Sequence, residues 1–257
     1  MALLARVGEL ARRSLLQTMR QPALVVPSIV FPLVLVAVTS GGLDAATGLP
    51  GFPSASYLDF IIAVPFIQGP LFAMINAGSA MARDVETGFL KRLALTPMQR
   101  SALLLGNLAG VMTVAALASL VYLVVGLAAG LHLEAGIGGG LVLIVLAVLV
   151  ALAFASLGAW VGLRAGSGEA VQGLFPVFFV FLFLSSQALP RPLIEQDWFR
   201  TIATWNPVSY MLEGIRSVVI TGWDRVALQR GFAIAIVLCV VGILGASRAL
   251  RTRLVRT

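Results

Sequence analysis

The chain has 257 residues, of which 59% are hydrophobic and only 11% are charged. Soluble domains typically carry about 25% charged residues. This chain has too few polar residues to cover a surface that faces water, which excludes a soluble enzyme and a disordered chain. The formal net charge of +7 would suit nucleic acid, but the arginines stand at the ends of apolar runs, where basic residues meet anionic lipid headgroups. The composition therefore predicts an integral membrane protein that contacts lipid and no nucleic acid.

Residues 1–22 predict an amphipathic helix that lies in the membrane interface. At helical spacing, leucines and other apolar residues gather on one face and arginines on the other. A secretory signal is not expected, because charges recur through the stretch and Pro27 and Pro32 interrupt the apolar run that follows. A plain juxtamembrane anchor and a contact with a partner protein both remain open for this helix.

Six apolar runs follow, each near or above the roughly 20 residues with which a helix crosses a bilayer. The predicted architecture is therefore all-α, with one transmembrane domain over residues 23–247 and a basic tail over residues 248–257. Pairs of small residues four apart indicate close helix packing; they are Gly106/Gly110, Gly126/Gly130 and Gly158/Gly162. The predicted spans lie near residues 23–40, 57–81, 103–130, 139–163, 171–189 and 230–247.

Basic residues are distributed unequally between the two ends of these spans. One side takes the N-terminus, the loop at 82–102, the turn at 164–170 and the tail, and it holds 13 of the 18 basic residues. Because basic residues concentrate in cytoplasmic loops, both termini are expected in the cytoplasm, in a multi-pass protein of the cytoplasmic membrane.

Residues that could perform chemistry within the chain are scarce. The sequence has no Gly-x-x-x-x-Gly-Lys-Ser/Thr phosphate loop, so no ATP site of that kind is expected. Its single histidine, His132, and single cysteine, Cys239, do not form a metal-ligand pattern. The predicted spans are almost free of ionisable residues, which counts against an ion-coupled carrier. We therefore expect no catalytic residue, metal or cofactor in this chain.

Two amides, Gln68 and Asn76, keep some polarity in the second predicted span, where Pro65 and Pro70 would kink the helix. Hydrogen bonding between helices and contact with a substrate both remain open for them. Phenylalanines in the fifth predicted span could line a substrate pathway or face lipid; they are Phe175, Phe178, Phe179, Phe181 and Phe183.

The predicted cytoplasmic loop at 83–100 mixes acidic, basic and apolar residues. It predicts a short helix along the inner membrane surface, and Thr96-Pro97 would end it, since the residue before a proline disfavours helix. A loop that only binds headgroups would need only basic residues. Glu86, Gly88 and the Thr-Pro stop instead favour a shaped docking surface.

The predicted outer segment at 190–229 contains a second short helix. Asn206 suits its N-cap, Pro207 its first position and Gly222 its end. Glu213 and Arg216 are three residues apart and could pair. A re-entrant helix that caps the bundle from outside and a simple surface helix are both compatible with this pattern.

These two segments together resemble type-2 ABC exporter permeases. Glu86-Thr87-Gly88-Phe89-Leu90-Lys91-Arg92-Leu93 with Thr96-Pro97 is similar to their Glu-x-Gly-Thr-Leu…Thr-Pro loop, although Phe89 stands where threonine is common. Asn206-Pro207…Tyr210…Glu213…Arg216 is similar to their Asn-Pro…Glu…Arg segment before the last span. In overall pattern the chain most resembles the daunorubicin-resistance kind of drug or lipid exporter.

The resemblance implies a half-transporter, in which two identical or similar permeases each sit on a separate ATPase subunit that binds ATP and Mg²⁺. The expected function is export of a hydrophobic or amphiphilic substrate such as a drug, lipid or glycolipid. A secondary carrier or channel and a non-transporting membrane assembly protein are the alternatives. By this resemblance the ATPase-coupling residues are Arg83, Asp84, Glu86, Gly88, Leu90, Thr96 and Pro97, and the outer re-entrant helix carries Asn206, Pro207, Glu213 and Arg216.

Overall fold

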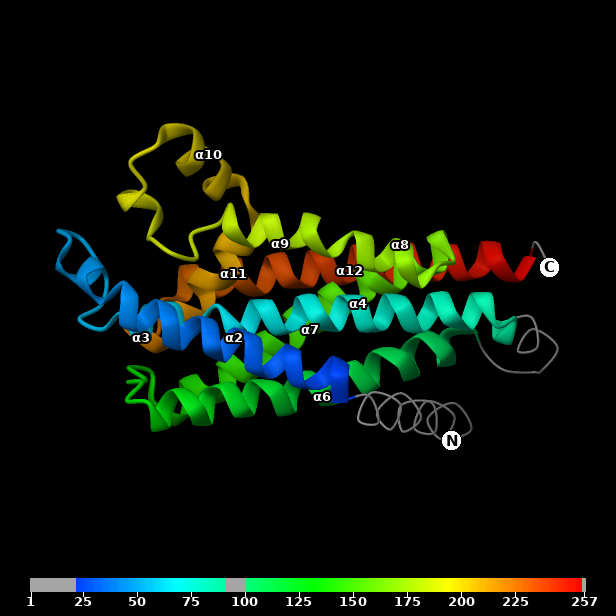
Figure 1. Ribbon diagram of the computed structural model, residues 1–257, viewed down its shortest axis with the longest axis horizontal. Coiled ribbons are helices and arrows are strands. Elements are labelled where there is room, and N and C mark those ends of the chain that lie inside the picture. Colours follow the sequence, from blue (N-terminus) through cyan, green and yellow to red (C-terminus); the bar gives the residue numbers. More distant parts are fainter. Residues whose placement is uncertain (1–21, 91–99, 256–257) are drawn as a thin grey trace.

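The computed structural model describes residues 22–90 and 100–255, and these residues form a bundle of helices without a strand (Figure 1). The amphipathic helix predicted at the N-terminus lies outside the described residues up to residue 21, and so do Thr96 and Pro97 of the predicted coupling loop.

Within the described part of the chain, five helical segments are long and apolar enough to cross a membrane. They confirm the first, second, third, fourth and sixth predicted spans at their approximate positions. The last of them extends well beyond residue 247, so the predicted tail continues the helix as far as Val255. The segments are α2 (Pro22–Gly42), α3 (Tyr57–Ile61) together with α4 (Pro65–Glu86), α6 (Arg100–Ala128), α7 (Gly136–Ala165) and α12 (Arg225–Val255).

The fifth predicted span differs from the expected single helix. It consists of α8 (Gly168–Gly173) and α9 (Phe175–Phe183), which together are shorter than the five long segments. Pro176 has no N–H with which to bond the carbonyl four residues earlier, so the helical hydrogen bonding is interrupted where α8 meets α9. The expected count of six full spans is therefore not confirmed among the described residues.

The helices place two short motifs at opposite ends of the bundle (Figure 1). The C-terminal ends of α4 and α12 lie at one end, whereas α3, α10 (Asp197–Trp205) and α11 (Pro207–Arg216) lie at the other. The α8–α9 segment runs from the first end back toward the second. The predicted coupling loop and the predicted outer segment thus lie at opposite ends of the molecule.

Helices α4 and α7 approach each other so closely that their backbones touch. A Cβ atom on Gly162 would lie 2.1 Å from the carbonyl oxygen of Gly78, and one on Gly158 would lie 2.0 Å from that of Met74. No side chain fits between the two helices at these points. The packing role predicted for Gly158 and Gly162 is confirmed. The one predicted for Gly130 is wrong, because a Cβ atom there would meet nothing within 4 Å among the described residues and its φ is +96°.

A tyrosine compensates for a proline inside α2. Pro32 lacks an N–H, so the carbonyl of Ser28 is left without its helical donor. The Tyr122 hydroxyl of α6 donates to that carbonyl at 2.6 Å. Gly69 of α4 provides the space, because a Cβ atom there would lie 2.7 Å from the Tyr122 oxygen. Helices α2, α4 and α6 are thereby fixed at one buried point.

Replacing Tyr122 by phenylalanine should lower the free energy of unfolding by about 1–3 kcal/mol, because the Ser28 carbonyl would lose its donor in the bundle interior. Thermal unfolding of the purified protein in detergent measures the effect. Tyr210→Phe is the matched control, since the Tyr210 hydroxyl donates to the Thr204 carbonyl at an exposed position. Equal losses in the two variants would contradict the role given to Tyr122.

Candidate functional site

The start of α11 is built as its sequence predicts. The side-chain oxygen of Asn206 accepts the N–H of Val208 at 2.9 Å, and Pro207 occupies the first helical position. The amide nitrogen of Asn206 also donates to the carbonyls of Phe181 (2.6 Å) and Leu184 (3.0 Å). One side chain therefore caps α11 and fixes it to the end of α9.

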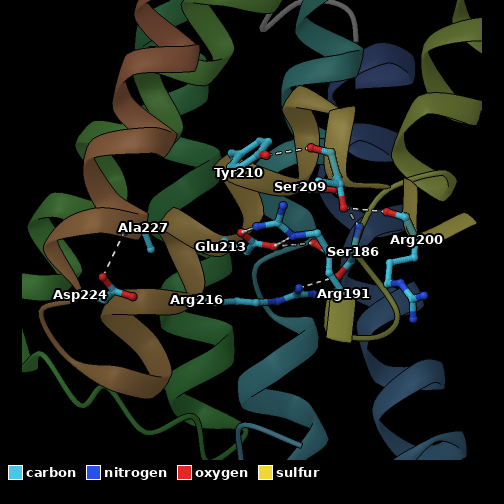
Figure 2. A network of polar contacts seen from close by, with 10 residues as sticks. Ser186, Arg191, Arg200, Ser209, Tyr210, Glu213, Arg216, Asp224 and Ala227 are labelled. Carbon is cyan, nitrogen blue, oxygen red and sulfur yellow. Dashed lines mark hydrogen bonds and ion pairs between the residues drawn. The ribbon is translucent and has the colours of Figure 1, made fainter. Parts of the chain in front are cut away.

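Arg216, at the end of α11, is buried and joins three parts of the chain. Its guanidinium donates to the carbonyls of Phe60 (2.9 Å), Ser186 (2.6 Å) and Gln187 (2.6 Å). It also lies 3.5 Å from the centre of the Phe60 ring, a cation–π contact. Only 6% of Arg216 is exposed. This arginine therefore connects α3, the segment after α9 and α11 (Figure 2).

Glu213 forms its ion pair with Arg191 and not with Arg216, the partner that the helical spacing allowed. Two guanidinium nitrogens of Arg191 contact the two carboxylate oxygens of Glu213, at 2.7 and 2.5 Å (Figure 2). The flat fork of an arginine favours this two-point contact, and the hydrogen bonds of Arg216 are directed to carbonyls instead. Burial lowers the pKa of Arg191, but Glu213 and the Tyr210 hydroxyl raise it more, so the net shift is upward.

We call Ser186, Arg191, Asn206, Glu213 and Arg216 the α11 polar cluster. The sequence pattern did not predict Arg191 or Ser186 as members. A charged residue between two prolines, directly after an apolar run, is the signal that could have identified Arg191. Nothing in the sequence marks Ser186, whose hydroxyl donates to Glu213 at 3.4 Å.

The described residues of the predicted coupling loop lie at the C-terminal end of α4. Arg83 and Glu86 are exposed and Asp84 is half-buried, whereas Leu90 is buried in the bundle. Gly88 has a φ of +65°, and a Cβ atom on it would meet no other atom within 4 Å. Within this chain the backbone conformation, rather than a lack of space, therefore requires glycine at this turn.

Two side chains hold the helix ends together near this turn. The Glu86 carboxylate accepts the N–H of Gly168 at 3.3 Å, where α8 begins. Arg253 of α12 donates to the carbonyls of Leu163 (3.0 Å) and Arg164 (2.9 Å) at the end of α7. Neither Arg253 nor Gly168 stood out in the sequence, because each acts on a helix end far away along the chain.

The residues proposed for a substrate pathway divide into two groups. Gln68 is completely buried, and neither atom of its amide has a partner among the described residues, while Asn76 is half-buried. Phe175, Phe178 and Phe179 of α9 pack against the core, whereas Phe181 and Phe183 are exposed. Ring centres are 5.4 Å apart for Phe72 and Phe175, 5.3 Å for Phe175 and Phe179, and 6.2 Å for Phe31 and Phe179, and Phe178 packs partly buried against the same core.

Nothing in the described residues forms a metal centre, since no group of three His, Cys, Asp or Glu side chains lies close enough there to hold an ion. The described chain is a multi-pass membrane protein. It has several apolar helices long enough to span a membrane, polar contacts at both ends and a closely packed α4–α7 pair.

The chain belongs to the ABC-2 type transporter family, whose model matches residues 6–220. A protein named "Putative transport permease ycf38" from Porphyra purpurea is 28% identical over 267 residues, covering 98% of this chain and 91% of that protein. Its namesake from Pyropia yezoensis is 29% identical over 221 residues, covering 84% and 74%. These matches confirm the resemblance to type-2 ABC permeases.

Proposed function

We propose that this chain is the permease subunit of an ATP-driven exporter, which moves a hydrophobic or amphiphilic substrate such as a drug, lipid or glycolipid out of the cell. The observation that carries the proposal is the family match over residues 6–220. The two motif segments at opposite ends of one bundle agree with it (Figure 1). In this proposal both termini are cytoplasmic, as the distribution of basic residues favours, and two permeases, identical or similar, act side by side.

In the proposed mechanism, a separate ABC ATPase subunit binds ATP and Mg²⁺ and presses on the end of α4. Arg83 and Glu86 are exposed there and available to a partner. Leu90 is 4% exposed, so its role would be to anchor the coupling segment to the bundle. The contact between Glu86 and Gly168 offers a route by which movement of the α4 end would reach α8 and then α9.

The Phe-rich face of α9 and the amides of Gln68 and Asn76 are proposed to meet the substrate. Gln68 supports this role because its buried amide has no partner among the described residues, and such a group is costly unless something binds it. The rings of Phe175, Phe178 and Phe179 would offer an apolar surface to the hydrocarbon part of the substrate.

Glu86→Ala should leave the protein folded and inserted but reduce ATP-dependent transport at least tenfold, while the ATPase partner continues to hydrolyse ATP. The measurement uses the permease–ATPase complex in liposomes, with a fluorescently labelled phospholipid as the transported probe. Glu134→Ala is the matched control, because Glu134 is exposed at the opposite end of the bundle.

Normal transport by Glu86→Ala would contradict the coupling role of that residue. The proposed function itself would be contradicted if no nucleotide-hydrolysing subunit copurified with this chain from native membranes. Transport driven by an ion gradient, with this chain alone in the liposomes, would favour a secondary carrier instead.

A further inference from the structure

A cavity of about 550 Å³ lies beside the α11 polar cluster, and its volume is within the range of small-molecule sites. Its walls come from the loop before α3, from α3, from the segment after α9, and from α10, α11 and the start of α12. Much of the wall is apolar, and the apolar lining residues are Pro53, Phe60, Pro190, Pro192, Ile220 and Ala227.

The charged side chains of the cavity do not cancel one another. Three arginines and two acidic residues line it, so the lining has one more positive charge than negative charges. Glu213 is bound at two points by Arg191. Asp224 accepts the N–H groups of Val226 and Ala227 and so caps α12 (Figure 2). The charged lining residues are Arg191, Arg200, Arg216, Glu213 and Asp224.

Arg216 forms no direct ion pair among the described residues, although the charge of Glu213 favours its charged form. Among the described residues no carboxylate lies within ion-pair distance of it, although it is 94% buried. A guanidinium has five N–H donors, and the carbonyls of Phe60, Ser186 and Gln187 take three of them. Two donors and the positive charge of a buried side chain are thus left at the wall of an open cavity, where they can attract an anion.

Arg200 also lines the cavity, although its charge is balanced by Asp197. It is exposed, pairs with Asp197 and donates to the carbonyl of Ile194 at 3.1 Å. Asp197 is itself outside the cavity lining. A negatively charged group that enters the cavity would therefore meet Arg200 first and Arg216 at the wall.

We propose that this cavity is a binding site for the anionic group, phosphate or carboxylate, of an amphiphile. The two arginines hold the anion, and the proline, phenylalanine and isoleucine side chains contact the adjoining apolar part. The proposal goes beyond the transport function and does not depend on ATP, so it can fail or succeed independently of it.

Binding of lysophosphatidylglycerol to the detergent-solubilised full chain, measured by native mass spectrometry, tests the proposal. We expect it to bind at least tenfold more tightly than lysophosphatidylcholine of the same chain length. Arg200→Gln and Ala227→Phe should each weaken binding at least fivefold, the first by removing a charge and the second by filling the cavity. Arg225→Gln should stay within twofold, since Arg225 is an exposed arginine of the same region that does not line the cavity.

Equal affinity for the two lysolipids would overturn the proposal. It would also be overturned if Arg225→Gln weakened binding as much as Arg200→Gln, because the attraction would then come from the general surface charge. Sodium phosphate added as a competitor distinguishes the two sources of the anion. Displacement at equal concentration would assign the site to free phosphate, and displacement only at large excess would assign it to a lipid headgroup; either result supports an anion site.

Discussion

Gly162→Ala should lower the free energy of unfolding by about 3 kcal/mol or more, an effect at the upper end of what overpacking costs. The new methyl group would stand 2.1 Å from the carbonyl oxygen of Gly78. That obstacle is backbone, so no change of side-chain rotamer can relieve it, and α4 and α7 would have to separate. Size-exclusion chromatography and thermal unfolding in detergent measure the loss.

Gly140→Ala is the matched control in the same helix. Its Cβ atom would lie 3.5 Å from the nearest atom, the Cδ2 of Leu123, which is an ordinary contact. Because alanine favours helix over glycine by about 0.5–1 kcal/mol, this variant should be as stable as the parent protein or more so. If Gly162→Ala were equally well tolerated, the close approach of α4 and α7 would be wrong.

Arg216→Met should destabilise the protein by about 3 kcal/mol or more, because each buried carbonyl left without a donor costs about 1–3 kcal/mol. The carbonyls of Phe60, Ser186 and Gln187 would lose their donor together. Arg216→Lys should lose less, because it keeps the charge but cannot reproduce the flat fork that reaches several acceptors. Thermal unfolding and limited proteolysis of the end that contains α10 and α11 measure the difference.

Arg200→Met is the control for Arg216→Met. Arg200 lies in the same region, but it is exposed and its ion pair joins it to Asp197 at the surface. Exposed ion pairs contribute about 0–1 kcal/mol, so this variant should unfold close to the parent temperature. An Arg216→Met protein as stable as the parent would contradict the central place of Arg216 in the α11 polar cluster.

The long helices could be predicted because a membrane span needs only a sufficiently long run of apolar residues, and the hydropathy of the sequence shows such runs directly. The fifth run has that composition without forming one helix. Beyond Phe183 the backbone leaves helical geometry, and the carbonyls of Ser186 and Gln187 turn to Arg216. Asn206 and Arg216, which come more than twenty residues later, therefore bind the carbonyls at and beyond the end of α9. Apolar composition does not reveal these contacts.

In the candidate site, too, contacts within one helix could be predicted from the sequence, whereas contacts between distant segments could not. The Asn206 cap and Pro207 start could be predicted because both act within one helical turn. The partner of Glu213 could not, because spacing along a helix identifies Arg216 but does not reveal Arg191, which comes from a separate segment. Glu86 and Gly168 are likewise 82 residues apart, and only the fold brings them together.

The backbone contact between α4 and α7 limits how this bundle could rearrange. At Gly158 and Gly162 no side chain separates the two helices, so one helix cannot slide lengthwise past the other there without a backbone collision. Helices α4 and α7 must therefore move together as a rigid body. The bundle would then rearrange at the contact between α9 and α2. Rings such as Phe31 and Phe179 meet there, and they can tilt and re-stack.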